Sequence, residues 1–252
     1  VGPGSSLQSV GKGIAALRPS AVVMIGIAFG VNDQKQSIGD ILVSRQLMLY
    51  DAQRVSATQI VPRGDRVHCS TWLLDYLTSA ELDWTGPKVR FGLVLTGDTL
   101  VDNVDYRDQL RKLEVEAIGG EMEGAGLYVA CQDAKVDWVL VKAICDWADG
   151  NKAQDKDARQ AQAAKNAAEF VLHALGHAAL TRQLAPRHQH RALAGFGHQH
   201  PGVAVAVPAQ QHAGVIAGEQ QDGRQGGNVD AIGSGTLQPH GHAGPCGGPL
   251  DQ

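Results

Sequence analysis

The first part of the chain, up to roughly residue 180, alternates short apolar runs with segments of mixed polarity. Runs rich in β-branched residues and bounded by turn residues predict buried strands. Apolar side chains that recur every three or four positions predict helices that bury one face. Strands are expected at residues 21–27, 41–45, 47–50, 89–95, 115–118 and 136–144, and helices at 11–17, 71–82, 105–113, 121–135 and 156–175.

Alternation of strands and helices is typical of an α/β fold, in which helices cover a mostly parallel or mixed sheet. We therefore expect residues 1–180 to form one domain. Its predicted architecture is a three-layer α-β-α arrangement with a central, twisted, mixed sheet.

The composition changes after Arg182, and residues 183–252 contain no Lys, Trp or Tyr but seven of the ten histidines. A segment with so few large apolar side chains cannot bury a core, so we predict a disordered, low-complexity tail. Metal binding is the alternative interpretation for six tail histidines, which are His188, His190, His198, His200, His240 and His242. They have neither cysteine nor acidic partners at a metal-site spacing, and no metal site is predicted.

Charge and cysteine usage narrow the class of protein further. The net charge of −4 and the pI near 6.2 argue against a general nucleic-acid or membrane-surface binder. No run approaches the length and apolarity of a membrane span. The four cysteines show no close-paired spacing and are read as reduced thiols. We expect a soluble cytoplasmic protein without a cofactor.

Four carboxylates lie at the edges of two predicted elements, and they are Glu121, Glu123, Asp146 and Asp149. The strand at 136–144 would deliver Asp146 at its carboxyl end, and the helix at 121–135 would carry the two glutamates in its first turn. Carboxylates in such places commonly line a small-molecule site of an α/β sheet. Acids in a first helical turn also complement the helix dipole, but that reading does not account for Asp146.

At these residues the chain resembles the nucleoside phosphorylase superfamily, and within it the branch of methylthioadenosine/S-adenosylhomocysteine nucleosidases. Four ordered segments carry the resemblance, which extends over residues 1–180: VVMIGIAFG at 22–30 followed by GDILVS at 39–44, GLVLTGD at 92–98, EMEGA at 121–125 and CDWAD at 145–149. Relatives begin with a further strand and hairpin, so the chain is expected to enter the fold partway, with those N-terminal strands missing.

The resemblance assigns roles to particular residues. Asp146 would give a proton to the departing base, and Glu123 would accept hydrogen bonds from the ribose hydroxyls and favour the developing cation. Burial beside apolar neighbours would help Asp146 to hold that proton. Met122 would pack on the sugar, although plain helix core is the alternative reading, and Glu121 would lie near the 2′-hydroxyl. The remaining predicted substrate contacts are Ala28, Gly30, Leu100 and Val101.

Some positions depart from the family pattern. Phosphorylases place a cation before the turn expected at Gly26–Gly30 and a hydroxyl inside it, whereas Met24 and Ile27 stand at these positions. An aliphatic residue, Leu100, replaces an aromatic one, and Cys145 replaces a serine beside Asp146. The phosphate position favours hydrolysis of a purine nucleoside over phosphorolysis.

Two alternatives stay open at this point. One is a phosphorylase that takes its phosphate contact from elsewhere, and the other is a non-catalytic nucleoside- or nucleotide-sensing domain. The expected partner is a small-molecule nucleoside, with phosphate as co-substrate in the phosphorolytic alternative. No nucleic acid or membrane is expected, and family habit implies a homo-oligomer.

Overall fold

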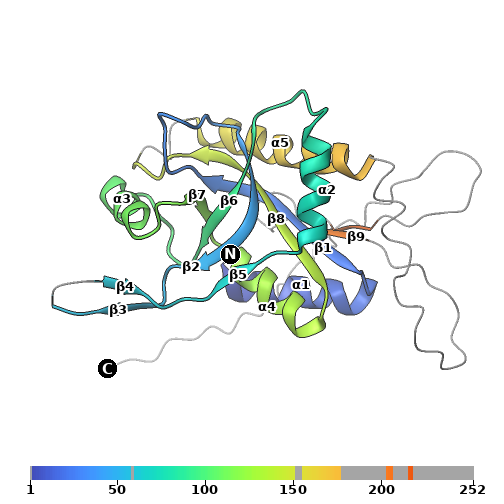
Figure 1. Ribbon diagram of the computed structural model, residues 1–252, viewed down its shortest axis with the longest axis horizontal. Helices are drawn as coiled ribbons and strands as arrows, with labels where there is room; N and C mark the ends of the chain where they lie inside the picture. The colour runs from blue at the N-terminus through green and yellow to red at the C-terminus, as the bar shows by residue number, and fades with distance from the viewer. Residues whose placement is uncertain (1, 58–59, 151–154, 177–202, 207–214, 218–252) are drawn as a thin grey trace, which may run out of the picture.

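The computed structural model describes residues 2–57, 60–150, 155–176, 203–206 and 215–217 (Figure 1). The helices are α1 (Pro3–Leu17), α2 (Thr71–Glu81), α3 (Val104–Leu113), α4 (Gly124–Ala134) and α5 (Lys156–Gly176). The strands are β1 (Ala21–Phe29), β2 (Ile41–Leu49), β3 (Gln53–Val55), β4 (Ile60–Pro62), β5 (Arg66–His68), β6 (Val89–Thr96), β7 (Ala117–Glu121), β8 (Asp137–Asp146), β9 (Val203–Ala206) and β10 (Val215–Ala217).

Eight of these strands form one mixed sheet, and five of them close into a ring. The ring runs β1–β7–β6–β2–β8 and returns to β1, with parallel pairing of β1 with β8 and of β6 with both β2 and β7. β2 and β8 pair antiparallel, as do β1 and β7. The predicted α/β class and mixed sheet are confirmed. The closure of the ring is a difference, because the layered arrangement that we predicted does not include it.

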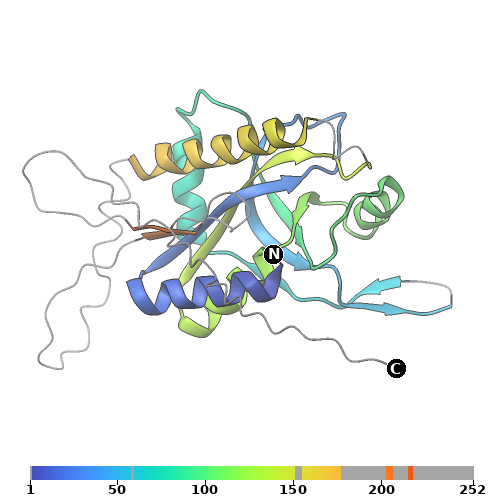
Figure 2. The same cartoon turned by 180° about the vertical axis from the view of Figure 1, so that it is seen from behind.

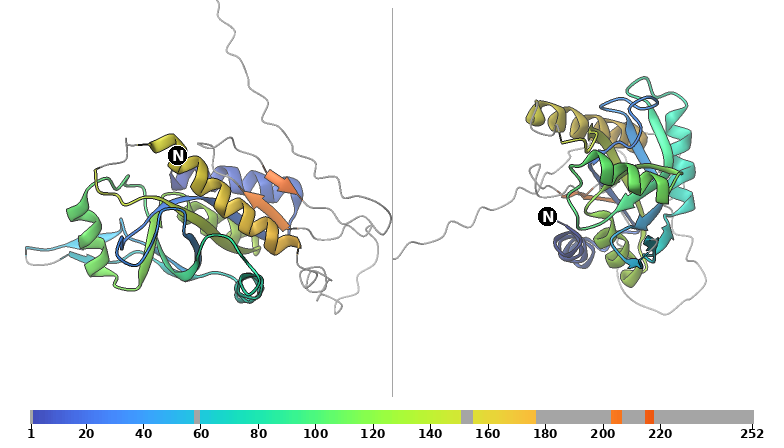
Figure 3. Two further views of the ribbon diagram at one scale, coloured as in Figure 1. Left: turned by 90° about the horizontal axis from the view of Figure 1, so that it is seen from above. Right: turned by 90° about the vertical axis from the view of Figure 1, so that its left-hand side faces the viewer.

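Helices cover the sheet from two sides. α1 packs against α4 along one side, and α5 packs on β1 and β8 along the other with α2 beside it (Figures 1 and 2). The view from above in Figure 3 shows α5 lying across the strands. α5 buries Ala163, Ala167 and Phe170 completely, and the middle of β8 is equally inaccessible to solvent. Burial of apolar surface, as between α5 and β8, is generally the dominant favourable contribution to folding.

Two adjacent glycines permit the ring to close where β7 meets β1. The two strands pair at Phe29 and Gly120. A Cβ atom at Gly120 would overlap the Phe29 ring, and one at Gly119 would lie 2.7 Å from the Phe29 carbonyl oxygen. Because any side chain would force the strands apart, Gly119-Gly120 is a requirement of the closure.

Three element boundaries differ from the sequence-based prediction near the expected site. The helix predicted from residue 121 begins at Gly124, so Glu121 ends β7 and Glu123 is the residue before α4. The Gly26–Gly30 segment is not a turn, because β1 continues through Phe29. α1 also begins earlier than predicted, at Pro3.

The predicted tail contributes two strands to the sheet. Val203–Ala206 pairs in parallel with Ala21–Met24 at the edge of β1, and β10 pairs antiparallel with β9. Ala204 and Val205 are buried there. This segment therefore packs, contrary to the expectation for the tail, while the six tail histidines lie outside the described residues.

Candidate functional site

Asp146 is the last residue of β8 and is 8% exposed. It pairs with Phe29, and its carbonyl oxygen accepts a hydrogen bond of 2.9 Å from the Gly30 amide. Its side chain accepts at Oδ1 from the Ala148 amide (2.9 Å) and at Oδ2 from the Cys145 thiol (3.2 Å). The carboxyl group is thus held by its own loop, with a thiol donor where the family pattern has a hydroxyl.

Gly30 and Trp147 pack against each other beside this loop. A Cβ atom at Gly30 would lie 2.5 Å from the Trp147 ring, so the indole packs directly on the glycine. The Trp147 carbonyl oxygen accepts a 3.0 Å hydrogen bond from the buried Arg107 guanidinium. These contacts fix the direction in which the chain leaves β8.

The two glutamates meet a buried cation. Lys142 Nζ lies 2.9 Å from Glu123 Oε2 and 3.4 Å from Glu121 Oε2, and the side chains of Lys142 and Glu121 are each 1% exposed. The Glu121 carboxylate also accepts hydrogen bonds from the amides of Glu123 and Gly124, at 2.9 and 3.0 Å. Glu123 is 14% exposed at its side chain and is the member of the cluster that solvent reaches most easily.

The surroundings shift the pKa values of the two glutamates in opposite directions. Burial raises the pKa of Glu121, since the charged form loses its hydration. Burial alone would also raise the pKa of Glu123, but the attraction and hydrogen bond of Lys142 outweigh it and lower that pKa. Burial disfavours the ammonium of Lys142, yet both carboxylates together raise the Lys142 pKa. At neutral pH this favours a charged Lys142–Glu123 pair.

Phe29 connects the two parts of the site. It pairs with Asp146 of β8 on one side and with Gly120 of β7, next to Glu121, on the other. The ring closure therefore brings the carboxyl ends of both acidic strands to the same residue. Ala28 and Gly30, the two predicted contacts that flank Phe29, are buried at this junction.

The other predicted contacts fall into different environments. Val101 is buried in the apolar cluster that contains Phe29, Tyr50 and Ala148. Met122 is half-buried, between the two glutamates in the chain. Leu100 is 67% exposed and does not form part of that cluster.

Sequence reasoning did not assign a role to two residues near the carboxylates. Lys142 lies within the apolar strand β8, and a lysine in such a strand is itself a signal of buried charge pairing. Tyr50 is buried and donates a 2.8 Å hydrogen bond to the Thr99 carbonyl oxygen. Burial and the nearby Asp51 raise the pKa of Tyr50, which keeps it a neutral donor.

The first three backbone amides after β1 already have acceptors within the protein. The Gly30 amide donates to Asp146, and those of Val31 and Asn32 both donate to Gln36 Oε1 at 3.0 and 2.9 Å. Arg18, the cation that precedes β1 in the chain, lies at the opposite end of that strand.

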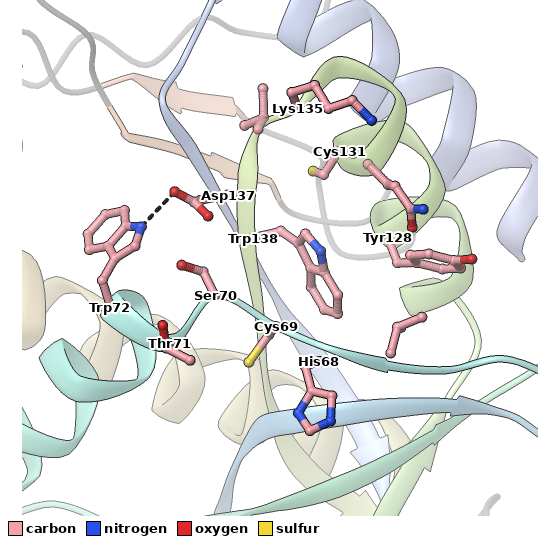
Figure 4. Close-up of a pocket in the computed structure, with 13 residues that line it drawn as sticks. His68, Cys69, Ser70, Thr71, Trp72, Tyr128, Cys131, Lys135, Asp137 and Trp138 are labelled. Atoms are coloured by element: carbon pink, nitrogen blue, oxygen red, sulfur yellow. Dashed lines mark hydrogen bonds between the residues drawn. The ribbon is translucent and has the colours of Figure 1, made fainter. Parts of the chain in front are cut away.

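A wide groove of about 590 Å³ lies at the other end of β8. Figure 4 shows its lining, which includes Trp72, Tyr128 and Trp138, with the Trp72 indole donating a 2.6 Å hydrogen bond to Asp137. None of the predicted site residues lines this groove. Burial raises the pKa of Cys131 in its wall to about 12, so that thiol is unreactive at neutral pH.

Two absences concern only the residues that the structure describes. No helix in this part of the chain has the length and apolar character needed to cross a membrane. The same residues contain no group of three or more His, Cys, Asp or Glu side chains placed to hold a metal ion.

The chain is an α/β protein with a closed ring of strands and buried acids at the strand ends. Comparison with known protein families identifies the family to which it belongs. The phosphorylase superfamily matches residues 5–176, and the chain belongs to that superfamily.

Named relatives fall in the nucleosidase part of this family. A death domain-containing ATP nucleosidase of Amphimedon queenslandica is 31% identical over 186 residues, covering 63% of this chain and 34% of that protein. The chain thus spans about a third of the length of that relative. A 5′-methylthioadenosine/S-adenosylhomocysteine nucleosidase of Staphylococcus carnosus is 25% identical over 182 residues, covering 68% of this chain and 79% of that protein.

Solved structures agree with the fold. The methylthioadenosine/S-adenosylhomocysteine nucleosidase of Neisseria meningitidis, in complex with methylthio-immucillin-A, has a TM-score of 0.61 at 23% identity. The match covers 69% of this chain and 77% of that one. Futalosine hydrolase of Helicobacter pylori gives a TM-score of 0.62 at 23% identity, over 69% and 76% of the two chains.

Proposed function

We propose that this protein hydrolyses the N-glycosidic bond of a purine nucleoside of the methylthioadenosine/S-adenosylhomocysteine type. The observation that carries the proposal is the junction at Phe29, where the strand that ends in Asp146 and the strand that ends in Glu121 meet. Lys142 Nζ lies 2.9 Å from Oε2 of the neighbouring Glu123 and lowers the pKa of that carboxyl group. An acid that donates a proton and a second acid that stays charged are the two groups that this reaction needs.

Asp146 is the proposed proton donor to the leaving base. As the bond between C1′ and the base nitrogen breaks, its electron pair goes to the base, and a proton from Asp146 neutralises the charge. A water molecule adds to C1′, and the proton that it releases passes through solvent to the Asp146 carboxylate, which restores the acid for the next cycle. General acid catalysis of this kind contributes about 10²–10⁴-fold in rate, which is roughly 3–5 kcal/mol of barrier.

Glu123 is the proposed partner of the sugar. Its carboxylate would accept hydrogen bonds from the 2′- and 3′-hydroxyls and stabilise the positive charge that develops on the ribose. Its greater exposure than Glu121 supports this division, because a substrate reaches the more exposed acid first.

The surroundings of β1 favour water over phosphate as the nucleophile. Met24 is buried and cannot bind an anion, and the amides of Gly30, Val31 and Asn32 already have acceptors within the protein. Phosphorolysis would require a cation and free donors at this position.

The relatives suggest two kinds of substrate for direct comparison. Similarity to nucleosidases of the methylthioadenosine/S-adenosylhomocysteine type favours an adenine nucleoside with a 5′-thioether substituent. Similarity to an ATP nucleosidase, at 31% identity, makes ATP a second candidate.

The test is release of free base from methylthioadenosine, adenosine, inosine and ATP, each with and without phosphate, followed by chromatography. Base released without phosphate, and lost in Asp146→Asn, is the expected result. Release that requires phosphate would replace hydrolysis by phosphorolysis. Calorimetric binding of a nucleoside with no base released would overturn catalysis in favour of a sensing domain.

A further inference from the structure

Lys142 is an unusual occupant of its position. It lies within β8 among fully buried apolar residues, and it is itself completely buried. Burial of an ammonium group is unfavourable unless opposite charges compensate, and apolar replacement of a buried ionic cluster is often neutral or even stabilising. Stability alone therefore does not explain a lysine here, and its two contacts with Glu121 and Glu123 indicate what it does.

The backbone around the two acids is held without Lys142. The Glu121 carboxylate accepts the amides of Glu123 and Gly124, and the Ser6 hydroxyl of α1 donates to the Glu123 carbonyl oxygen at 2.8 Å. The Glu123 side chain is different, because its Oε2 atom is held by Lys142 Nζ. Loss of the lysine would leave the loop in place but release this carboxylate.

Among the residues that the structure describes, the ionisable groups that act on Glu123 are Lys142 of β8 and Glu121 of β7. The adjacent α1 contributes the neutral Ser6 hydroxyl. Tyr50, the residue after β2, is near enough to Glu121 for the two groups to interact electrostatically, and it is a neutral phenol. Two carboxylates and one ammonium in a buried space leave one excess negative charge, so a proton taken up by the cluster is most stable on the more deeply buried Glu121.

We propose that Lys142 is a positioning residue that holds Oε2 of Glu123 and keeps this carboxylate charged, so that Oε1 is available to the ribose hydroxyls. The inference rests on the proposed function for its substrate. It adds that one buried cation decides which of two neighbouring acids serves the sugar.

Removal of the Lys142 ammonium should change the pKa of Glu123 in a known direction. Lys142 lowers the pKa of Glu123, so Lys142→Met raises it. Activity that needs charged Glu123 is then lost at a higher pH than in the wild type, and the acid limb of the kcat profile moves upward in pH. A lysine with a merely structural role would lower kcat equally at every pH.

The experiment measures kcat and KM for base release against pH in four proteins. Lys142→Met is expected to lower kcat on the order of 10²-fold at neutral pH, with the acid limb displaced upward. Lys142→Arg keeps a cation and should restore the limb to its wild-type position. Lys165→Met, which removes an exposed lysine paired with Glu169, is the matched control and should resemble the wild type. An unmoved limb in Lys142→Met would overturn the inference.

A second measurement keeps the test decisive if Lys142→Met does not fold or if no substrate is found. Glutamates labelled with ¹³C at the carboxyl carbon report the titration of Glu123, assigned by the signal lost in Glu123→Gln. Glu121→Gln retains the Lys142–Glu123 pair and should not raise the Glu123 midpoint. A raised midpoint there, or an unchanged one in folded Lys142→Met, would overturn the inference. The expected midpoints with no base released from any nucleoside would instead contradict the proposed function.

Discussion

Strand β8 carries an aspartate at each end, and the two ends differ in almost every other respect. Asp137 is exposed beside the wide groove and accepts a hydrogen bond from Trp72. Asp146 is buried, receives a backbone amide and a thiol, and adjoins the junction with β7. The wide groove therefore lies at the end of β8 where the aspartate is exposed. The other end of β8 is distinguished by buried groups of opposite charge, the Lys142 ammonium and the carboxylates of Glu121 and Glu123. Such a cluster is a more specific sign of a functional site than a hollow in the surface.

The largest expected effect sets one end of β8 against the other. Asp146→Asn should lower kcat for base release by about 10²–10⁴-fold, because the amide cannot donate the proton that the leaving base requires. Asp137→Asn, the same change at the groove end, should alter activity by about twofold at most. Steady-state kinetics on both variants measures the contrast. Equal losses would mean that the two ends do not differ in function.

Glu123→Gln tests whether the acid beside Lys142 acts in the reaction through its negative charge. It should lower kcat by about 10²–10³-fold while changing KM less, since the anion is needed mainly when positive charge develops on the sugar. Glu116→Gln, at an exposed position before β7, is the matched control and should keep wild-type kinetics. A rise in KM with unchanged kcat would assign Glu123 to ground-state binding only.

The smallest expected effect concerns the close contact between β7 and β1, which brings the ends of the two acidic strands together. Gly120→Ala introduces a methyl group into the Phe29 ring and should destabilise the fold by about 1–3 kcal/mol. Gly13→Ala, in open space on α1, should stabilise it by about 0.5–1 kcal/mol. Urea unfolding measures both. A neutral Gly120→Ala would show that β7 and β1 need no close approach.

Local patterns predicted the buried strands well, because β-branched runs such as the one in β8 bury both faces. They misplaced the beginning of α4 by three residues. Glu121 fits a helical first turn in sequence, yet it ends β7, where Leu95 and Thr96 of β6 pair with Gly120 and Glu121. Pairing between distant segments overrode the local preference.

The features that were not predicted all depend on contacts between distant parts of the chain. Ring closure follows from the fit of Gly119-Gly120 against Phe29, which no window of neighbouring residues contains. The two contacts of Lys142 join it to Glu123 and Glu121, which lie 19 and 21 positions away in the chain. The roles of Asp146 and Glu123 came from family resemblance, and they stay predictions until they are measured.

The pairing of β9 with β1 has a practical consequence for anyone shortening the chain. Val203–Ala206 satisfies the outer backbone groups of Ala21–Met24, which belong to an apolar strand. A version cut after α5 would leave that strand with unpaired amides and carbonyls along one margin, a template onto which other molecules add. Any trimmed form intended for crystallisation should therefore retain residues 203–206, or mask the margin with a charged or proline substitution.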